Sequence, residues 1–124
     1  MLPNLEAHAT LPAADIERAR KFYTEKLGFT ADTSMPGGIV FRSKNSWFLV
    51  YPTQYAGTAQ HTLLGWETQN IEQDVKELRV RGVDFEEYDS PDLKTVNSVA
   101  MMGPNKAAWF KDSEGNILSL IQLG

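Results

Sequence analysis

The stretch that decides the fold runs from His8 to Phe29 and reads HATLPAADIERARKFYTEKLGF. It begins as an extended segment, continues as an amphipathic helix and ends at a glycine. Asp15 stands at the expected N-cap, because its carboxylate can accept hydrogen bonds from the free N–H groups of the first turn. Gly28 stands where a left-handed residue ends a helix at little cost. The stretch therefore predicts a strand, a capped helix and a return to extended chain.

The same order of features recurs from His61 onward. Asn70, followed three residues later by Gln73, is typical of a capping box, and Gly82 ends the second predicted helix as Gly28 ends the first. The offset between the copies is 53 residues for the histidines and 54 residues for the glycines. A near-constant offset of this kind indicates one unit made twice.

Alternating apolar and polar residues, with turn signals between them, predict the strands. In the first module we expect strands at residues 5–11, 30–35, 39–42 and 47–51, with Pro12 ending the first of them. In the second module we expect strands at residues 61–66, 83–88, 98–102, 106–111 and 116–122, and a loop at 89–97. The sequence therefore predicts an α+β fold of two βαβββ modules, with curved sheets around a cavity.

Composition limits the class of protein. The 124 residues are 42% hydrophobic, which fits one domain with its modules at about residues 1–55 and 60–124 and a linker at 52–60. A formal net charge of -4 argues against nucleic-acid or anionic membrane partners. The chain has no cysteine, and no stretch is apolar enough for a membrane helix. We expect a cytoplasmic protein.

The quoted stretch resembles the opening of the vicinal oxygen chelate superfamily, which includes glyoxalase I, bleomycin-resistance proteins and extradiol dioxygenases. The matching features are His8, Asp15 seven residues later, and the Leu-Gly-Phe sequence that ends at Phe29. The stretch from Trp109 to Asn116, WFKDSEGN, is similar to the closing motif, in which an aromatic strand leads into a D-x-x-G-N turn. The resemblance covers essentially the whole chain and implies a homodimer with a cavity between paired modules.

The resemblance also implies positions for a metal site. In metal-dependent members, four strands each contribute one ligand, and by motif His8 falls on the first position and His61 on the third. The second falls at or near Tyr51, where glyoxalase I has a carboxylate, and the fourth falls on Ser119, where glyoxalases and dioxygenases carry glutamate. Two histidines can help to bind Zn(II), Ni(II), Mn(II) or Fe(II), but both carboxylates are missing. Glu6, two residues before His8, is the candidate replacement.

Two functions follow from these residues. The first hypothesis is a small-molecule binder of the bleomycin-resistance type, which encloses a partly aromatic ligand. The second is a metal-dependent lyase, isomerase or dioxygenase that acts on a vicinal-oxygen substrate through His8 and His61. The missing carboxylates favour the binder, whereas the two histidines favour the enzyme. The predicted ligand-binding residues are Tyr51, Trp66, Trp109 and Ser119. The sequence leaves open the ligand and whether the modules pair within one chain or between chains.

Overall fold

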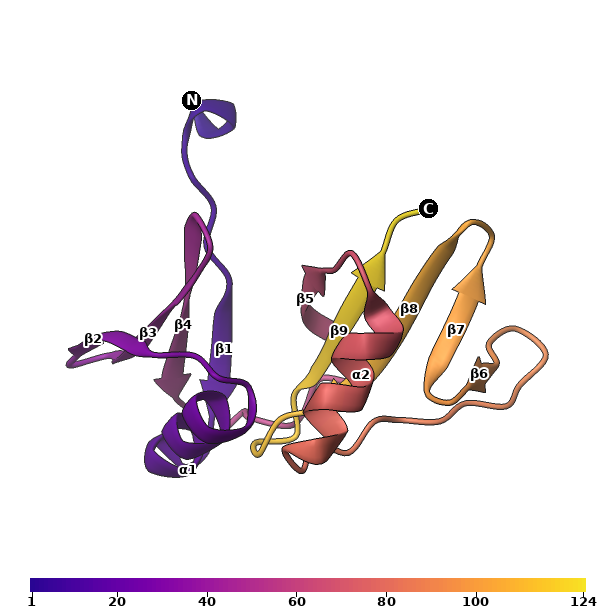
Figure 1. Cartoon of the computed structure of the whole chain (residues 1–124). Helices are drawn as coiled ribbons and strands as arrows, with labels where there is room; N and C mark the ends of the chain where they lie inside the picture. The colour runs from indigo at the N-terminus through magenta and orange to yellow at the C-terminus, as the bar shows by residue number, and fades with distance from the viewer.

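The structure is a computed structural model that describes the backbone of residues 1–124 and all side chains except those of Thr33, Ser34 and Met35. Figure 1 shows two sheets, one in each half of the chain, with the N-terminal half in indigo and magenta and the C-terminal half in orange and yellow. Each sheet carries one main helix. The predicted α+β architecture with two modules is confirmed.

The first module follows the predicted βαβββ order. Its elements are β1 (Thr10–Ala13), α1 (Ile16–Lys21), a π-helical turn η2 (Phe22–Lys26), β2 (Ala31–Met35), β3 (Gly38–Ser43) and β4 (Ser46–Pro52). The strands lie in the order β1-β4-β3-β2, with β1 parallel to β4 and the other pairs antiparallel. The sheet therefore has β1 at one edge.

The position predicted for the first strand is wrong. The strand begins at Thr10 rather than at residue 5, and Pro12 lies within it instead of ending it. The backbone carbonyl of Ala9 accepts a hydrogen bond from Leu49 of β4, and that of Ala13 accepts one from Thr53, which follows β4. The backbone nitrogen of Pro12 therefore faces away from that partner. Because β1 is an edge strand, the missing N–H of proline breaks no hydrogen bond of the sheet.

The second module repeats the order with one addition. Its elements are β5 (Thr62–Glu67), α2 (Ile71–Val80), β6 (Thr95–Val96), β7 (Val99–Met102), β8 (Asn105–Lys111) and β9 (Ile117–Gln122). The strand order is β5-β9-β8-β7-β6, and β5 runs parallel to β9 as β1 runs parallel to β4. The two-residue strand β6 lies within the predicted loop 89–97.

The strand predicted at residues 83–88 does not form. Only Phe85 makes an isolated bridge, to Phe110 of β8, and the next N–H donates to the carbonyl of Trp109. The Glu87 carboxylate instead accepts hydrogen bonds from Thr95 and from the backbone and hydroxyl of Ser98. These bonds join Glu87 to residues 8 and 11 positions later in the chain. Residues 83–88 therefore form an irregular segment, although their apolar and polar residues alternate as in a strand.

The helix boundaries follow local signals. Asp15 accepts hydrogen bonds from two backbone N–H groups of the first turn of α1, each at 3.1 Å. Asn70 caps α2 through the N–H of Gln73, at 3.3 Å, but the side chain of Gln73 donates to Glu77. The predicted capping box is therefore only half formed. The glycines that follow the two helices adopt the left-handed conformation, as predicted. Within the described residues, no helix is long and apolar enough to cross a membrane.

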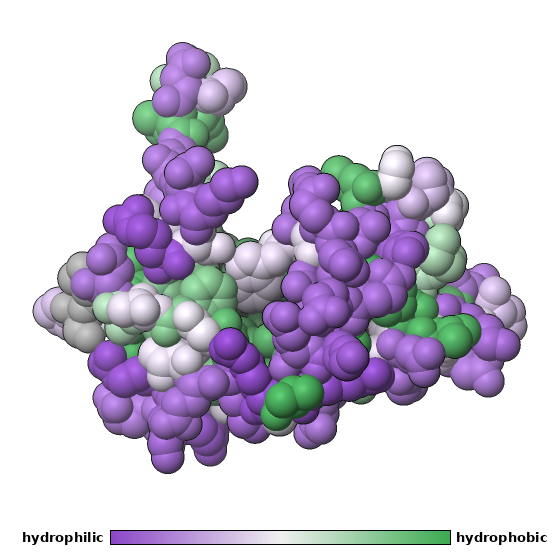
Figure 2. Space-filling model, in the orientation of Figure 1, coloured by the Kyte–Doolittle hydropathy of each residue, from purple (hydrophilic) through white to green (hydrophobic). Residues whose placement is uncertain are grey.

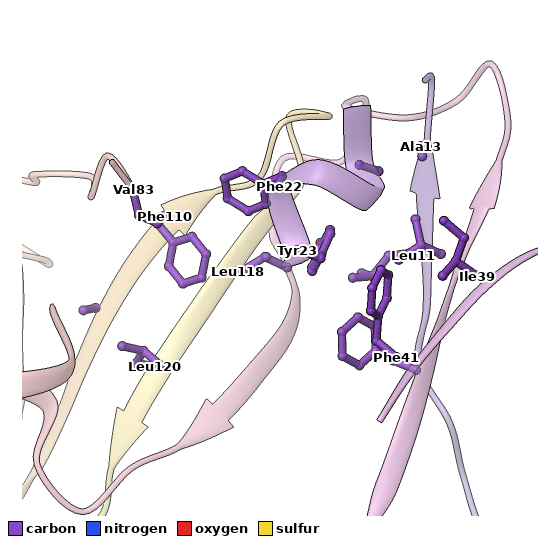
Figure 3. Close-up of a cluster of buried hydrophobic side chains, with 14 of the residues drawn as sticks. Leu11, Ala13, Phe22, Tyr23, Ile39, Phe41, Val83, Phe110, Leu118 and Leu120 are labelled. Atoms are coloured by element: carbon purple, nitrogen blue, oxygen red, sulfur yellow. The ribbon is translucent and has the colours of Figure 1, made fainter. Parts of the chain in front are cut away.

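One apolar core lies between the modules. Figure 3 shows Tyr23 between Leu118 of the second sheet and Leu11 of the first. The ring of Tyr23 stacks on Phe41 at 5.4 Å between centroids and is fully buried. On β4 and β9 the buried residues alternate with partly exposed ones, so each sheet turns one face to this core and one away from it.

A polar turn of the second module joins it to the first. The side chain of Glu114 is fully buried and accepts hydrogen bonds from the backbone N–H groups of Ala14 and Asp15, at 2.9 and 2.8 Å. The guanidinium of Arg18 donates to the same carboxylate at 2.8 Å. A carboxylate at the N-terminal end of α1 also interacts favourably with the helix dipole. The start of α1 is therefore bound directly to the turn before β9.

Asp112 and Asn116, on either side of Glu114, complete this junction. The hydroxyl of Tyr23 donates to the Asp112 carboxylate at 2.6 Å. The amide of Asn116 donates to the backbone carbonyl of Pro12 at 2.8 Å. We call Asp112, Glu114 and Asn116 the junction turn, because each of them forms a hydrogen bond across the two modules.

Glu114 makes the fold less stable at acid pH. Burial alone raises the pKa of Glu114, but hydrogen bonds from Arg18, Asp15 and Ser113 outweigh burial and bring the pKa from 4.5 to about 2. Because the pKa is lower in the folded state, the stabilisation is complete above pH 4.5 and is lost as the pH falls toward 2. We expect the free energy of unfolding, measured by urea denaturation, to fall by about 3 kcal/mol over this window.

The Glu114→Gln variant should be less stable at neutral pH and should lack this part of the pH dependence. The matched control is Glu17→Gln in α1, because the Glu17 side chain is 73% exposed. A pH profile of Glu114→Gln that runs parallel to the wild-type profile would contradict the assignment.

Candidate functional site

Each sheet has an open face, which we define as the face turned away from the core. On β4 the side chains of Phe48 and Val50 point into the core, so Trp47, Leu49 and Tyr51 lie on the open face of the first sheet. The strand register adds neighbours to this face, because Thr10 pairs with Leu49 and Arg42 pairs with Trp47. The predicted ligand-binding residue Tyr51 therefore lies on an open face.

His8 is held against the open face of the first sheet. Its ring stacks on Trp47 with 3.6 Å between centroids and 15° between planes. The Nδ1 atom lies 2.9 Å from the backbone carbonyl of Trp47, and because a carbonyl can only accept, Nδ1 carries the proton. The other nitrogen, Nε2, lies 3.5 Å from the Glu6 carboxylate. These two contacts and the stacking on Trp47 fix the orientation of the ring.

The open face of the second sheet carries an aromatic beside small residues. Ser119 of β9 pairs with Gly65 of β5 on one side and with Trp109 of β8 on the other, so the three share a face. The ring of Tyr88 meets Trp109 edge to face at 5.6 Å. Burial and the carboxylate of Glu86 raise the pKa of Tyr88, so its phenol stays protonated at neutral pH. We call Gly65, Ser119, Trp109 and Tyr88 the tryptophan face.

Gly65 makes room on the tryptophan face. A Cβ atom built at Gly65 would lie 2.5 Å from the hydroxyl of Ser119. Glycine inside a strand often marks a place where a ligand or another backbone approaches closely. The small side chain of Ser119 lies between Gly65 and the indole ring of Trp109, and its hydroxyl takes the space that a side chain at residue 65 would need.

Trp66 lies on the other side of the second sheet. It pairs with Leu120, which points into the core, and its ring lies 6.0 Å from that of Phe48 in the first module. Neighbouring residues of a strand point to opposite faces, so Trp66 cannot share a face with Gly65. The structure brings Trp109 and Ser119 together but places Trp66 between the modules.

The open faces meet at a groove between the modules. The groove has a volume of about 270 Å³, and its walls include Trp47 from the first open face and Gly65 from the second. Ala9 of the chain before β1 and Leu64 of β5 also line it. The groove therefore links His8 and its stacked tryptophan to the small-residue edge of the tryptophan face.

The two histidines do not form a metal site within one chain. His61 is exposed and precedes β5 in the second module, whereas His8 lies on the first sheet. Among the side chains that the structure describes, no three of His, Cys, Asp or Glu come together as metal ligands would. His8 and Glu6 supply two groups, and catalytic metal sites generally use three protein ligands. Within one chain, the described residues therefore supply only part of the ligand set that the resemblance implies.

Sequence reasoning missed two residues of the site, Gly65 and Tyr88, and one contact, the stacking of Trp47 on His8. Gly65 could have been found, because a glycine inside an apolar strand is a recognisable signal. Tyr88 could not, because it reaches Trp109 through an irregular segment that the sequence predicts as a strand.

The two modules and their strand order define the fold of the glyoxalase, bleomycin-resistance and dioxygenase proteins. The fold implied by the resemblance to the vicinal oxygen chelate superfamily is thus confirmed. The family model that describes the N-terminal part of bleomycin-resistance-like proteins matches residues 7–41. This match includes the stretch from His8 to Phe29.

Solved structures give the same fold over nearly the whole chain. UcmS2 is 21% identical, with a TM-score of 0.74 over 94% of this chain and 98% of that one. The glyoxalase family protein from Enterococcus faecalis is 18% identical, with a TM-score of 0.74 over 98% and 99%. TnmS3, an antibiotic binding protein from Streptomyces sp. CB03234, is 21% identical, with a TM-score of 0.69 over 98% of each chain. No curated protein matches the chain by sequence.

The contact between Gly65 and Ser119 predicts a specific coupling. We expect Gly65→Ala to lower the free energy of unfolding by about 1 kcal/mol, because the added methyl group must displace the serine hydroxyl. In a Ser119→Ala background the same change should cost much less, since the remaining Cβ of residue 119 lies 3.8 Å from the new one. Urea denaturation of the double-mutant cycle measures the coupling.

The matched control is Gly37→Ala, because a Cβ at Gly37 meets nothing within 4 Å. An equal cost of Gly65→Ala with and without the Ser119 hydroxyl would disprove the contact.

Proposed function

We propose that the protein binds a small, partly aromatic molecule on its open sheet faces. The observation that carries this proposal is the tryptophan face, where the half-buried indole of Trp109 lies beside the small residues Ser119 and Gly65. Binding sites for small molecules are mostly apolar and aromatic, with a few polar groups that fix orientation. The tryptophan face has this character.

Each residue of the face has a role in such binding. The ring of Trp109 offers a flat surface for a ligand ring, and Tyr88 supports it edge to face. The hydroxyl of Ser119 can donate or accept one hydrogen bond. Gly65 allows the ligand to approach the backbone of β5. On the first sheet, Tyr51 and the stacked pair of His8 and Trp47 are the corresponding recognition groups.

A second copy of the chain completes the pocket in this proposal. Each open face is a sheet surface whose partly exposed aromatic residues need a cover. The open face of a sheet from a second copy would supply it and would enclose the ligand on both sides. The protein is then a homodimer, with recognition residues from both chains. The neighbour TnmS3, an antibiotic binding protein, supports a ligand of this general kind.

A metal-dependent enzyme is the second candidate function. One observation favours it: the Trp47 carbonyl accepts a hydrogen bond from Nδ1 of His8 and orients the ring, which is a common arrangement for a metal-binding histidine. The described side chains of one chain supply no third ligand, so the binder is the better supported function.

Metal content separates the two functions. For the binder we expect no stoichiometric metal after incubation with Zn(II), Ni(II), Mn(II) or Fe(II), measured by elemental analysis. About one equivalent per chain, lost in both His8→Ala and His61→Ala, would favour the enzyme instead.

Trp109 carries the main test of the binding proposal. We expect Trp109→Leu to weaken the binding of a planar aromatic ligand about fivefold, because a ring contact contributes about 1 kcal/mol beyond buried area. The probes are bleomycin, anthraquinone-2-sulfonate and 8-anilinonaphthalene-1-sulfonate, titrated by calorimetry.

The matched control is Tyr55→Leu, because Tyr55 is a 67% exposed aromatic residue of the linker. It should bind each probe as the wild type does. Failure of all three probes to bind at millimolar concentration, or equal affinities for Trp109→Leu and the wild type, would contradict the proposal.

A further inference from the structure

A small hollow lies between the two modules, on the side of β5 to which Trp66 points. It has a volume of about 140 Å³ and opens between the end of η2 and α2. We call it the inter-module crevice. The first module supplies two of its lining residues and the second module supplies the others, and all are apolar: Leu27, Phe29, Trp66, Leu78, Phe110 and Leu120.

Three aromatic rings border the inter-module crevice. The ring of Trp66 lies 5.7 Å from that of Phe29 and 6.4 Å from that of Phe110, measured between centroids. Figure 3 shows Phe110 and Leu120 on the second sheet, at the back of this space. Aromatic rings prefer to meet other rings at separations of about 4.5–7 Å, stacked with an offset or edge to face. The lining therefore offers ring contacts from both modules to a further ring.

A π-helical turn places one wall of the crevice. The backbone N–H of Leu27 donates to the carbonyl of Phe22, five residues earlier, at 3.2 Å. An α-helix would make this bond to the residue four positions earlier. π-helical turns of this kind are frequent at functional sites. Leu27, at the end of this turn, faces Leu78 of α2 across the crevice.

Reciprocal contacts join the helix ends next to the crevice. Nζ of Lys26 donates to the carbonyl of Gly82 at 3.2 Å, and its stem lies 3.5 Å from the place of a Cβ atom at Gly82. A Cβ atom at Gly28 would lie 2.9 Å from the guanidinium of Arg81. Each left-handed glycine thus leaves room for a cationic side chain of the other module. The crevice is therefore bordered by helix ends that are already in contact.

The size of the crevice limits what it can hold. Pockets for drug-sized ligands have volumes of about 300–1,000 Å³, so 140 Å³ is too small for linked or fused rings. An apolar cavity of roughly 150 Å³ stays dry and binds benzene. A charged group would lose its hydration among apolar side chains without gaining a partner. We propose that the inter-module crevice binds one uncharged six-membered aromatic ring, as a monocyclic arene.

This site is separate from the tryptophan face and does not depend on the proposed function. Trp66 and Gly65 are neighbours in β5 and point to opposite sides of the sheet. Trp66 also lines the groove between the open faces, whereas Leu78 lines only the crevice of the two. Figure 2 shows green and white residues in the recess between the two halves, flanked by the hydrophilic surface of α2. A ring bound in the crevice would contact both modules.

Nuclear magnetic resonance tests the place of binding directly. The chain has three tryptophans, so the indole N–H groups give three signals, assigned with Trp47→Phe, Trp66→Phe and Trp109→Phe. Titration with fluorobenzene should shift the Trp66 signal saturably, with a dissociation constant in the millimolar range or below. A saturable shift of the Trp47 or Trp109 signal would place the ring elsewhere and overturn the proposal. Absence of any saturable shift up to the solubility limit of fluorobenzene would also overturn it.

A variant that fills the crevice tests the lining. Leu78→Phe should weaken fluorobenzene binding at least about tenfold, because the larger side chain occupies the space of the ligand. The matched control is Val80→Phe, which adds the same ring to α2 at a side chain that is 83% exposed and lies outside the crevice. It should bind fluorobenzene as the wild type does. Equal affinities of Leu78→Phe and the wild type would refute the site, and circular dichroism checks that both variants fold.

A variant that enlarges the crevice gives an independent test, which stands even where Leu78→Phe fails to fold. The wild type should prefer fluorobenzene to benzofuran, an uncharged molecule with two fused rings. Leu78→Ala should reverse this preference, since it removes part of one wall. An unchanged preference would contradict the proposal.

The charge of the ligand is tested with 4-fluorobenzoate, which has the same ring and a carboxylate. It should bind the wild type at least about tenfold more weakly than fluorobenzene at neutral pH. Equal affinities for the two probes would show that the site does not select an uncharged ring.

Discussion

The arrangement of the two modules depends on one buried carboxylate. A buried Glu114 without partners would cost several kcal/mol, because its charge would lose its hydration. Here the N-terminal turn of α1 supplies backbone donors and Arg18 supplies an opposite charge. These donors belong to the first module, whereas Glu114 belongs to the second. Separating the modules would break the hydrogen bonds from Ala14, Asp15 and Arg18 to the carboxylate. This interaction therefore holds both halves in one orientation.

A fixed orientation of the modules decides which surfaces remain for function. The junction turn brings Tyr23 against Asp112, and the ring of Tyr23 then fills the space between the sheets. The core faces of both sheets pack against each other in this arrangement, and Trp66 packs against the same core. What remains are the open faces, which border a common groove at Trp47 and Gly65. The faces that carry the candidate site are therefore the ones that the common core leaves exposed.

Local signals in the sequence predicted the helices and most strands, since an Asp15 cap or a left-handed Gly28 acts within a few residues. Long-range interactions could not be predicted in this way. The partners of Glu114 in the first module lie about a hundred residues earlier in the chain. No residue near Glu114 in the sequence identifies them. The predicted strand at 83–88 failed for the same reason, because hydrogen bonds to Ser98 decide its path. The site was predicted in part, since Trp109 and Ser119 meet but Tyr88 was missed.

The alternation of a β-strand explains how so small a module can present two different surfaces. Along β8, Trp109 points to the open face, whereas Lys106 points to the side that carries α2. A ligand on the tryptophan face and the side chains beneath α2 would therefore lie on opposite sides of the same strand. The two sets of side chains are separated by the thickness of the sheet. Substitutions on the open face can thus alter ligand recognition while the junction turn preserves the fold.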